Sequence, residues 1–104
     1  MEPVSKSDLF RTLREQKHEP SDDQLDRLRH AGLIPPFVPM QGKGNERFLS
    51  AQGASRIRIY YEIRRRFNLK KPRMAEVAFW FAACGFDVPP NLVAALFRKE
   101  RRGS

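Results

Sequence analysis

The stretch that most limits the possible folds of the chain covers residues 21–48, where signals that start and stop a helix follow one another closely. Ser21, three residues before Gln24, forms a capping-box pattern, and two aspartates in the first turn suit the positive end of the helix dipole. Gly32 stands where a left-handed C-terminal cap belongs, and two successive prolines soon after it prevent the helix from continuing. The sequence therefore predicts a helix of about three turns.

The segment after this helix has the pattern of a β-hairpin. Phe37, Val38 and Met40 form a strand-like run, and Arg47 and Phe48 begin the return. Between them lie residues typical of a tight turn, namely Gly42, Lys43, Gly44 and Asn45. A short helix followed by a basic hairpin is the layout of a winged helix-turn-helix.

A first helix is predicted over residues 6–17, before the Ser21 helix. Ser5 and Asp8 form a capping pattern at its start, and Leu9 and Leu13 lie on one edge. Pro20 blocks further helix and delivers the chain to the Ser21 cap. The predicted helix-turn-helix thus covers about residues 6–32, and the wing about residues 37–49.

Three more helices are predicted over about residues 51–102. The first follows Ser50 and ends near Phe67, the second opens at Pro72 and stops at Gly85, and the third opens at Pro90. Their apolar stripes are Ile57, Tyr60, Ile63 and Phe67 in the first, Met74, Val77, Ala78 and Phe81 in the second, and Leu92, Val93, Leu96 and Phe97 in the third. The predicted fold class is mainly α: one domain, residues 1–104, with a winged helix-turn-helix and additional C-terminal helices.

Positive charge is concentrated after the two prolines. The chain has 20 Lys and Arg against 12 Asp and Glu; residues 1–36 hold six basic and seven acidic residues, and the rest holds 14 and five. Such an uneven distribution of basic residues indicates that the protein binds a polyanion. Double-stranded DNA is the partner that we expect. The predicted DNA contacts are Gln24, Arg27, Arg29, Lys43, Arg47, Arg56, Arg58, Arg64, Arg65, Lys70 and Lys71.

The run LRHAGLIPP, then a glycine-rich turn, then ERF before another helix, resembles the DNA-binding domain of MerR-type regulators. The resemblance covers about the middle half of the chain, and Gly32, Arg47 and Phe48 match best. It implies a transcription regulator. The single cysteine, which cannot form an internal disulfide, favours a cytoplasmic location, and we expect a nucleoid-associated protein. The family's arginine and tyrosines in the second helix are replaced here by Asp26, Arg27 and Leu28, so its contacts do not transfer directly.

Two other functions remain open at this point. The same fold would serve a recombination accessory or directionality factor, which would also be short and basic. A protein-interaction module is the alternative from another class, with Phe79 and Trp80 meeting a partner. These two aromatics lie off the stripe of their helix, so a homodimer or side-by-side protomers on DNA are also expected.

Catalysis, metals and cofactors find no support in the residue pattern. His18 and His30 each stand alone, without a nucleophile or ligand set at a suitable spacing. The three aspartates of the Ser21 helix are better explained as helix-start residues than as a cation site. Cys84 is predicted to be a small core residue. On this pattern we do not expect an enzyme. No apolar run approaches the ~20 residues of a membrane span, so we do not expect a membrane protein either.

Overall fold

The computed structural model describes residues 3–39 and 46–95, and within these ranges the chain is mainly helical. The helices are α1 (Lys6–Glu15), α2 (Asp22–His30), α3 (Ala51–Arg66) and α4 (Met74–Ala83). Residues 90–95 form a further helical segment. Two short strands, β1 (Val4–Ser5) and β2 (Phe48–Leu49), complete the fold. No helix in these two ranges has the length and apolar character needed to cross a membrane.

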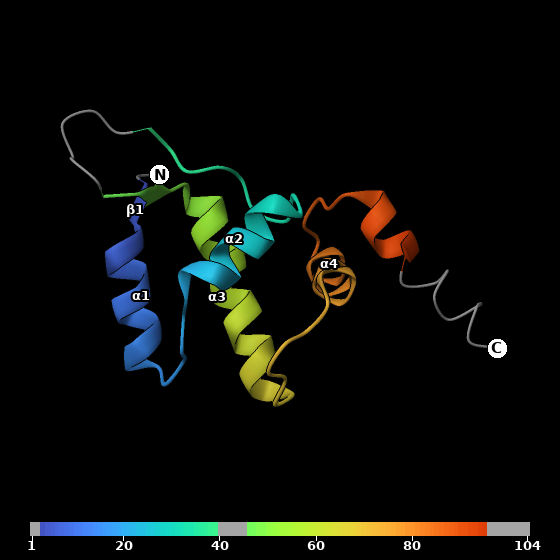
Figure 1. Ribbon diagram of the computed structural model, residues 1–104, viewed down its shortest axis with the longest axis horizontal. Helices are drawn as coiled ribbons and strands as arrows, with labels where there is room; N and C mark the ends of the chain where they lie inside the picture. Colours follow the sequence, from blue (N-terminus) through green and yellow to red (C-terminus); the bar gives the residue numbers. More distant parts are fainter. Residues whose placement is uncertain (1–2, 40–45, 96–104) are drawn as a thin grey trace.

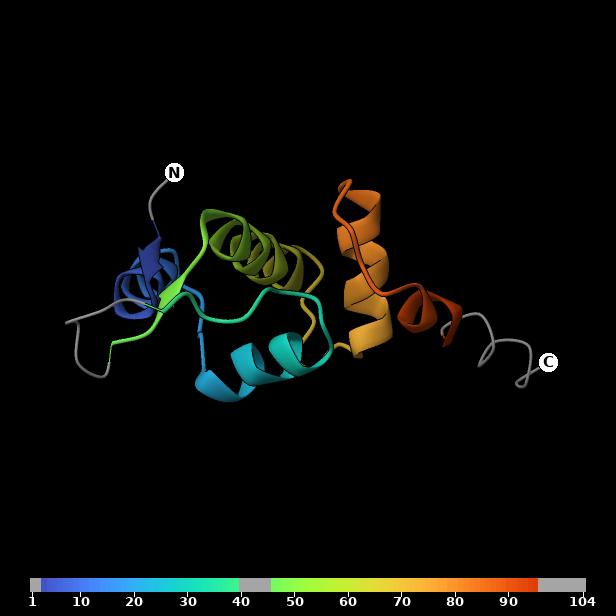
Figure 2. The same ribbon diagram turned by 90° about the horizontal axis from the view of Figure 1, so that it is seen from above.

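Helices α2 and α3 lie in the middle of the molecule, with α1 on one side of them and α4 on the other (Figures 1 and 2). Helix α4 is seen end-on in Figure 1 and from the side in Figure 2, so it crosses the direction of the other helices. Figure 2 also shows α2 against one side of α3. Among the described helices, none covers the outer side of α2 (Figure 2).

Three predicted helix starts are confirmed by their capping bonds. The hydroxyl of Ser5 accepts from the backbone N–H of Asp8 at 3.1 Å, that of Ser21 from Gln24 at 3.2 Å, and that of Ser50 from Gly53 at 3.1 Å. Each bond satisfies a donor that the first helical turn leaves unpaired. Helix α4 differs, since it begins at Met74 without a side-chain cap, two residues later than predicted.

All four helices end in the same way, with a residue in the left-handed region and a backbone bond from the next residue. At the end of α2, Gly32 has φ +77° and the N–H of Leu33 donates to the carbonyl of Leu28 at 3.0 Å. Gly85 ends α4 with φ +91° in the same geometry. This is the Schellman motif, which favours glycine at the left-handed position. In α1 and α3 that position is held by Lys17 (φ 71°) and Asn68 (φ 54°).

The strands tie the N-terminus to the segment before α3. β1 and β2 pair antiparallel with Val4 opposite Leu49, and an isolated antiparallel bridge joins Val38 to Phe48. The carboxylate of Glu46 accepts from the hydroxyl of Ser5, and from the hydroxyl of Ser7 at 3.0 Å. The Val38 bridge connects the two sides of the predicted hairpin, whose turn residues lie outside the described ranges. Pairing of the hairpin with an N-terminal strand was not predicted.

One apolar core joins the helices, and its largest fully buried members are Tyr60, Phe81, Leu9, Leu13, Leu28, Leu33, Leu49, Ile57 and Val77. Two core predictions were wrong. Phe67 is 65% exposed, because it is the C-terminal cap of α3 and no longer follows the helical stripe. Cys84 is exposed for the same reason, as the C-terminal cap of α4.

Candidate nucleic-acid interface

Helix α2 is fixed to α3 by apolar and polar contacts. Leu25 and Leu28 are buried, which turns the opposite side of α2 outward. At its first turn, the hydroxyl oxygen of Tyr61 accepts from the backbone N–H of Ser21 at 3.3 Å, and the hydroxyl donates to the side-chain oxygen of Gln24. Sequence reasoning missed this role of Tyr61, because the partners lie about 40 positions away in the chain.

Two of the three carboxylates on α2 are paired with cations. Asp22 lies 2.6 Å from the ammonium of Lys6, and Asp26 lies 2.9 Å from the guanidinium of Arg29. The hydrogen bond from Arg29 lowers the pKa of Asp26 below its ordinary value. These pairs offset the negative charge that would oppose a polyanion at this helix. In the described ranges, no cation lies within ion-pair distance of Asp23, and no carboxylate lies within ion-pair distance of Arg27.

Arg47 lies just before β2 and adds a positive charge close to Arg29 of α2. Its guanidinium carbon lies 5.1 Å from the ring centre of Phe37, and that of Arg29 lies 5.5 Å from the same centre. The two guanidinium groups thus share one aromatic ring, an arrangement that orders both of them. The charge of Arg47 also helps to lower the pKa of Asp26. Lys43, the other predicted contact of the wing, lies outside the described ranges.

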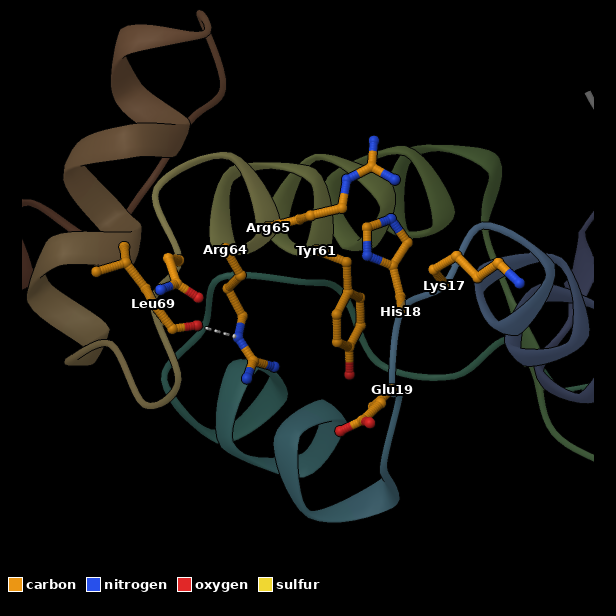
Figure 3. Close-up of a pocket in the computed structure, with 8 residues that line it drawn as sticks. Lys17, His18, Glu19, Tyr61, Arg64, Arg65 and Leu69 are labelled. Atoms are coloured by element: carbon orange, nitrogen blue, oxygen red, sulfur yellow. Dashed lines mark hydrogen bonds between the residues drawn. The ribbon is translucent and has the colours of Figure 1, made fainter.

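On the opposite flank of α2, Arg64 organises the turn that follows α3. Figure 3 shows its guanidinium pointing toward α2. It donates to the carbonyl of Leu69 at 3.2 Å and to that of Lys70 at 2.6 Å. Lys71, the next residue, lines a hollow of about 490 Å³ together with residues of α2, including Gln24, Arg27 and His30. Lys70 and Lys71 are both exposed in this turn, and Lys71 lies beside α2.

Two other arginines of α3, Arg58 and Arg65, lie on another side of the helix. Figure 3 shows Arg65 pointing away from α2, and its guanidinium binds the carbonyl of Gln16 at 3.1 Å and the carboxylate of Glu62 at 3.0 Å. Arg58 is exposed and lies seven residues earlier, about two helical turns, so it shares that side. The predicted DNA contacts on α3 are therefore divided between different sides of the helix.

Arg56 was predicted to contact phosphate, and the structure contradicts that role. Only 6% of the residue is exposed. One terminal nitrogen donates to the carbonyl of Leu33 at 2.7 Å, and the guanidinium carbon lies 4.9 Å from the ring centre of Phe86. Burial lowers the pKa of the guanidinium, and the charge of Asp87 opposes that effect. Arg56 therefore holds the turn after α2 against the segment after α4.

A second hollow, of about 230 Å³, lies between the end of α1 and the end of α3. His18 is buried there, with Nε2 3.8 Å from the carboxylate of Glu62, and burial lowers the pKa of its imidazole. The cations around this hollow do not converge: Arg64 points toward α2, Arg65 points the opposite way, and Lys17 points away from both (Figure 3). No group of three potential metal ligands occurs in the described part of the chain.

The predicted partner residues on α4 differ in exposure. Phe79 is 48% exposed, whereas Trp80 is partly buried and packs against the core. Trp80 therefore contributes to folding as well as to any contact surface.

No protein-family model, no curated protein and no solved structure matches the chain.

Proposed function

We propose that the protein binds double-stranded DNA as a small MerR-like transcription regulator of the winged helix-turn-helix type. Helix α2 enters the major groove, and the segment that carries Arg47 acts as the wing beside it. The observation that carries the proposal is the placement of cations on both flanks of the uncovered side of α2. Arg47 lies on one flank, and Lys70 and Lys71 lie on the other, with Arg27 between them.

The roles divide between phosphates and bases. Arg47, Lys70 and Lys71 are exposed and stand at the margins of α2, where the sugar-phosphate backbone passes a helix in the major groove. Gln24 and Arg27 lie on α2 itself, within reach of base edges. Arg58 and Arg65 lie on the other side of α3, where they would meet DNA only if it wrapped around the domain. The protein is expected to act in the cytoplasm, associated with the nucleoid.

Binding by fluorescence anisotropy to a random-sequence duplex, a single strand and a double-stranded RNA tests this proposal. Duplex DNA should bind best at low salt, and its affinity should fall steeply as salt rises, because phosphate contacts release counterions. Arg27→Ala should weaken binding, whereas Arg11→Ala should not, since Arg11 lies on α1 and pairs with Asp8. Absence of duplex binding at low salt would overturn the proposal.

A recombination accessory factor would use the same surface, and a selected operator that flanks recombination sites would favour it. A protein-interaction module is favoured by one observation, the exposure of Phe67 and Phe79. The same aromatics support a homodimer or side-by-side protomers on DNA, because one small module reads few base pairs. Sedimentation of the free protein and of its complex with a long duplex distinguishes these assemblies; one protomer per site at every concentration would exclude self-association.

A further inference from the structure

Phe67 and Phe79 are the large apolar side chains that stand exposed on the described surface, at 65% and 48% exposure. Their surroundings differ in charge. Phe79 lies on α4, which contains no basic residue and a single acidic one, Glu76. Phe67 lies at the end of α3, and the stretch between Glu62 and Glu76 around it has six basic residues and no acidic residue. The two exposed rings therefore suit different partners.

The surroundings of Phe67 fit a nucleic acid better than a protein. Protein interfaces are depleted in lysine, yet Lys70 and Lys71 are exposed three and four residues after Phe67. An apolar ring beside ammonium groups suits a partner that offers both negative charge and flat aromatic faces. Nucleic acids offer phosphates and bases in this combination. Lys71 also lines the hollow beside α2, so this turn lies at the margin of the proposed DNA surface.

An ordered turn presents the ring. The N–H of Phe67 donates to the carbonyl of Ile63 at 3.0 Å, which places Phe67 at the end of the helix. The N–H of Leu69 then donates to the carbonyl of Arg64 at 2.8 Å. In return, the guanidinium of Arg64 binds the carbonyls of Leu69 and Lys70 (Figure 3). A ring on a backbone held in this way loses less conformational entropy when it binds a partner.

We infer that Phe67 is an apolar wedge that inserts its ring into a base step of the bound duplex, while Lys70 and Lys71 hold the phosphates beside that step. A phenylalanine ring can enter between adjacent base pairs from the minor groove and partly unstack them. With α2 in the major groove, the turn after α3 stands next to the backbone that separates the two grooves. The inference rests on the proposed binding of duplex DNA and adds a contact that depends on how easily a base step opens.

The first test measures base stacking directly. Preferred sites are selected from a randomised duplex pool, and 2-aminopurine, whose fluorescence rises when it is unstacked, is placed at successive positions of the selected site. Wild-type protein should brighten one step, and a pyrimidine–purine step is expected there, because such steps unstack most easily. Phe67→Ala should bind without brightening any position. Absence of brightening with the wild type, or equal brightening with Phe67→Ala, would overturn the inference.

Affinity separates the ring from the neighbouring cations. Phe67→Ala should weaken duplex binding roughly tenfold and leave the slope of log K against log salt unchanged, because no charge is removed. Lys71→Ala, in the same turn, should reduce that slope by about 0.9. A mismatch at the opened step should strengthen wild-type binding, since a mismatched base costs less to unstack, and should not strengthen binding by Phe67→Ala. Wild-type affinity in Phe67→Ala would overturn the inference.

Two further variants test the chemistry of the side chain. Phe67→Ala should fold like the wild type, because most of the residue is exposed, and circular dichroism checks this. Phe67→Leu and Phe67→Gln are a pair of similar size that differ in polarity. Leucine is also found as a wedge, so Phe67→Leu should still open the step, whereas Phe67→Gln should not. Equal behaviour of the two variants would contradict apolar insertion.

Failure of the inference is distinguishable from failure of the proposed function. Duplex binding that Phe67→Ala leaves unchanged would remove the wedge and keep DNA binding in place. Loss of self-association in Phe67→Ala by sedimentation, with duplex binding unchanged, would assign the ring to a protein contact instead. Lack of duplex binding by the wild type at low salt would remove both the wedge and the proposed function.

Discussion

Arg56 and Arg58 are two residues apart on α3, yet they have different surroundings and should behave differently when replaced. Arg56→Ala removes the donor that satisfies the buried carbonyl of Leu33 and the contact with Phe86. We expect it to lower the free energy of unfolding by about 2 kcal/mol or more. Arg58→Ala, at an exposed position, should change that free energy by less than about 0.5 kcal/mol. Urea unfolding followed by circular dichroism measures both.

Arg56→Ala also shows whether Arg56 contacts DNA. Under conditions where the protein stays folded, Arg56→Ala should leave the salt dependence of DNA binding unchanged, because a buried guanidinium makes no phosphate contact. A shallower salt dependence in Arg56→Ala, with the fold intact, would show that this residue reaches the DNA after all.

His18 should make the protein less stable in mild acid. Burial, followed by the charge of Arg65, lowers the pKa of its imidazole below the ordinary 6.5, while the nearby Glu62 acts in the opposite direction. The unfolded chain therefore binds a proton at a higher pH than the folded chain does. Stability is complete above about pH 6.5 and decreases as the pH falls from there to the lowered pKa of the folded state.

His18→Gln removes this titration, so the urea midpoint of the variant should change less between pH 7.5 and 5.5 than that of the wild type. Equal losses in the two proteins over this interval would assign the acid sensitivity to other groups.

Residue types alone predicted which side chains cap and stop the helices. They did not predict which charged side chains remain exposed and able to bind a partner. The serine caps and Gly32 depend on neighbours within four positions, so the local sequence contains the whole interaction. The burial of Arg56 and the bond between Tyr61 and Gln24 depend on contacts 23 and 37 positions apart. A basic run in a sequence does not show that one of its arginines faces the core.

At the scale of the elements, the ends of the helices offer a direct test of backbone strain. Lys17 occupies the left-handed position that ends α1, with φ 71°, and glycine adopts this conformation without the penalty of a Cβ. Lys17→Gly should therefore raise the free energy of unfolding by about 1 kcal/mol. Asn68→Gly should raise it by less, because asparagine tolerates this region. Thermal and urea unfolding of both variants measure the difference; no gain from Lys17→Gly would contradict the assigned end of α1.

The reverse substitution separates strain from crowding. Gly32 and Gly85 both have positive φ, so alanine should be strained at either position. A Cβ at Gly32 would also lie 3.2 Å from a ring carbon of Pro89, whereas a Cβ at Gly85 meets nothing within 4 Å. Gly32→Ala should therefore destabilise the protein more than Gly85→Ala does, by urea unfolding. Equal losses would show that the segment after α4 does not pack on the end of α2.

The strands were harder to predict than the helices, and the reason is physical. Each helix contains its own hydrogen bonds, whereas β1 is two residues long and forms only because the segment before α3 lies beside it. The pairing of Val4 with Leu49 joins residues 45 positions apart in the sequence. Glu46 strengthens it by binding Ser5 and Ser7, which also lowers the pKa of the Glu46 carboxyl. Local sequence patterns do not predict such long-range strand pairings.

For the whole molecule, we propose that DNA lies along α2 and not along the far side of α3. Two triple variants remove the same amount of charge from different places. Arg47→Ala, Lys70→Ala and Lys71→Ala together remove the cations beside α2. Arg11→Ala, Arg58→Ala and Arg66→Ala together remove three exposed cations elsewhere on the described surface.

The deciding measurement is the slope of log K against log salt concentration for duplex binding by the wild type and these two variants. Each lost phosphate contact should reduce the slope by about 0.9, so the variant beside α2 should lose close to 3 in total. The matched variant should keep the wild-type slope, because its arginines contact no phosphate in the proposed complex. Equal reductions in the two variants, or a larger reduction in the matched one, would contradict the placement of DNA along α2.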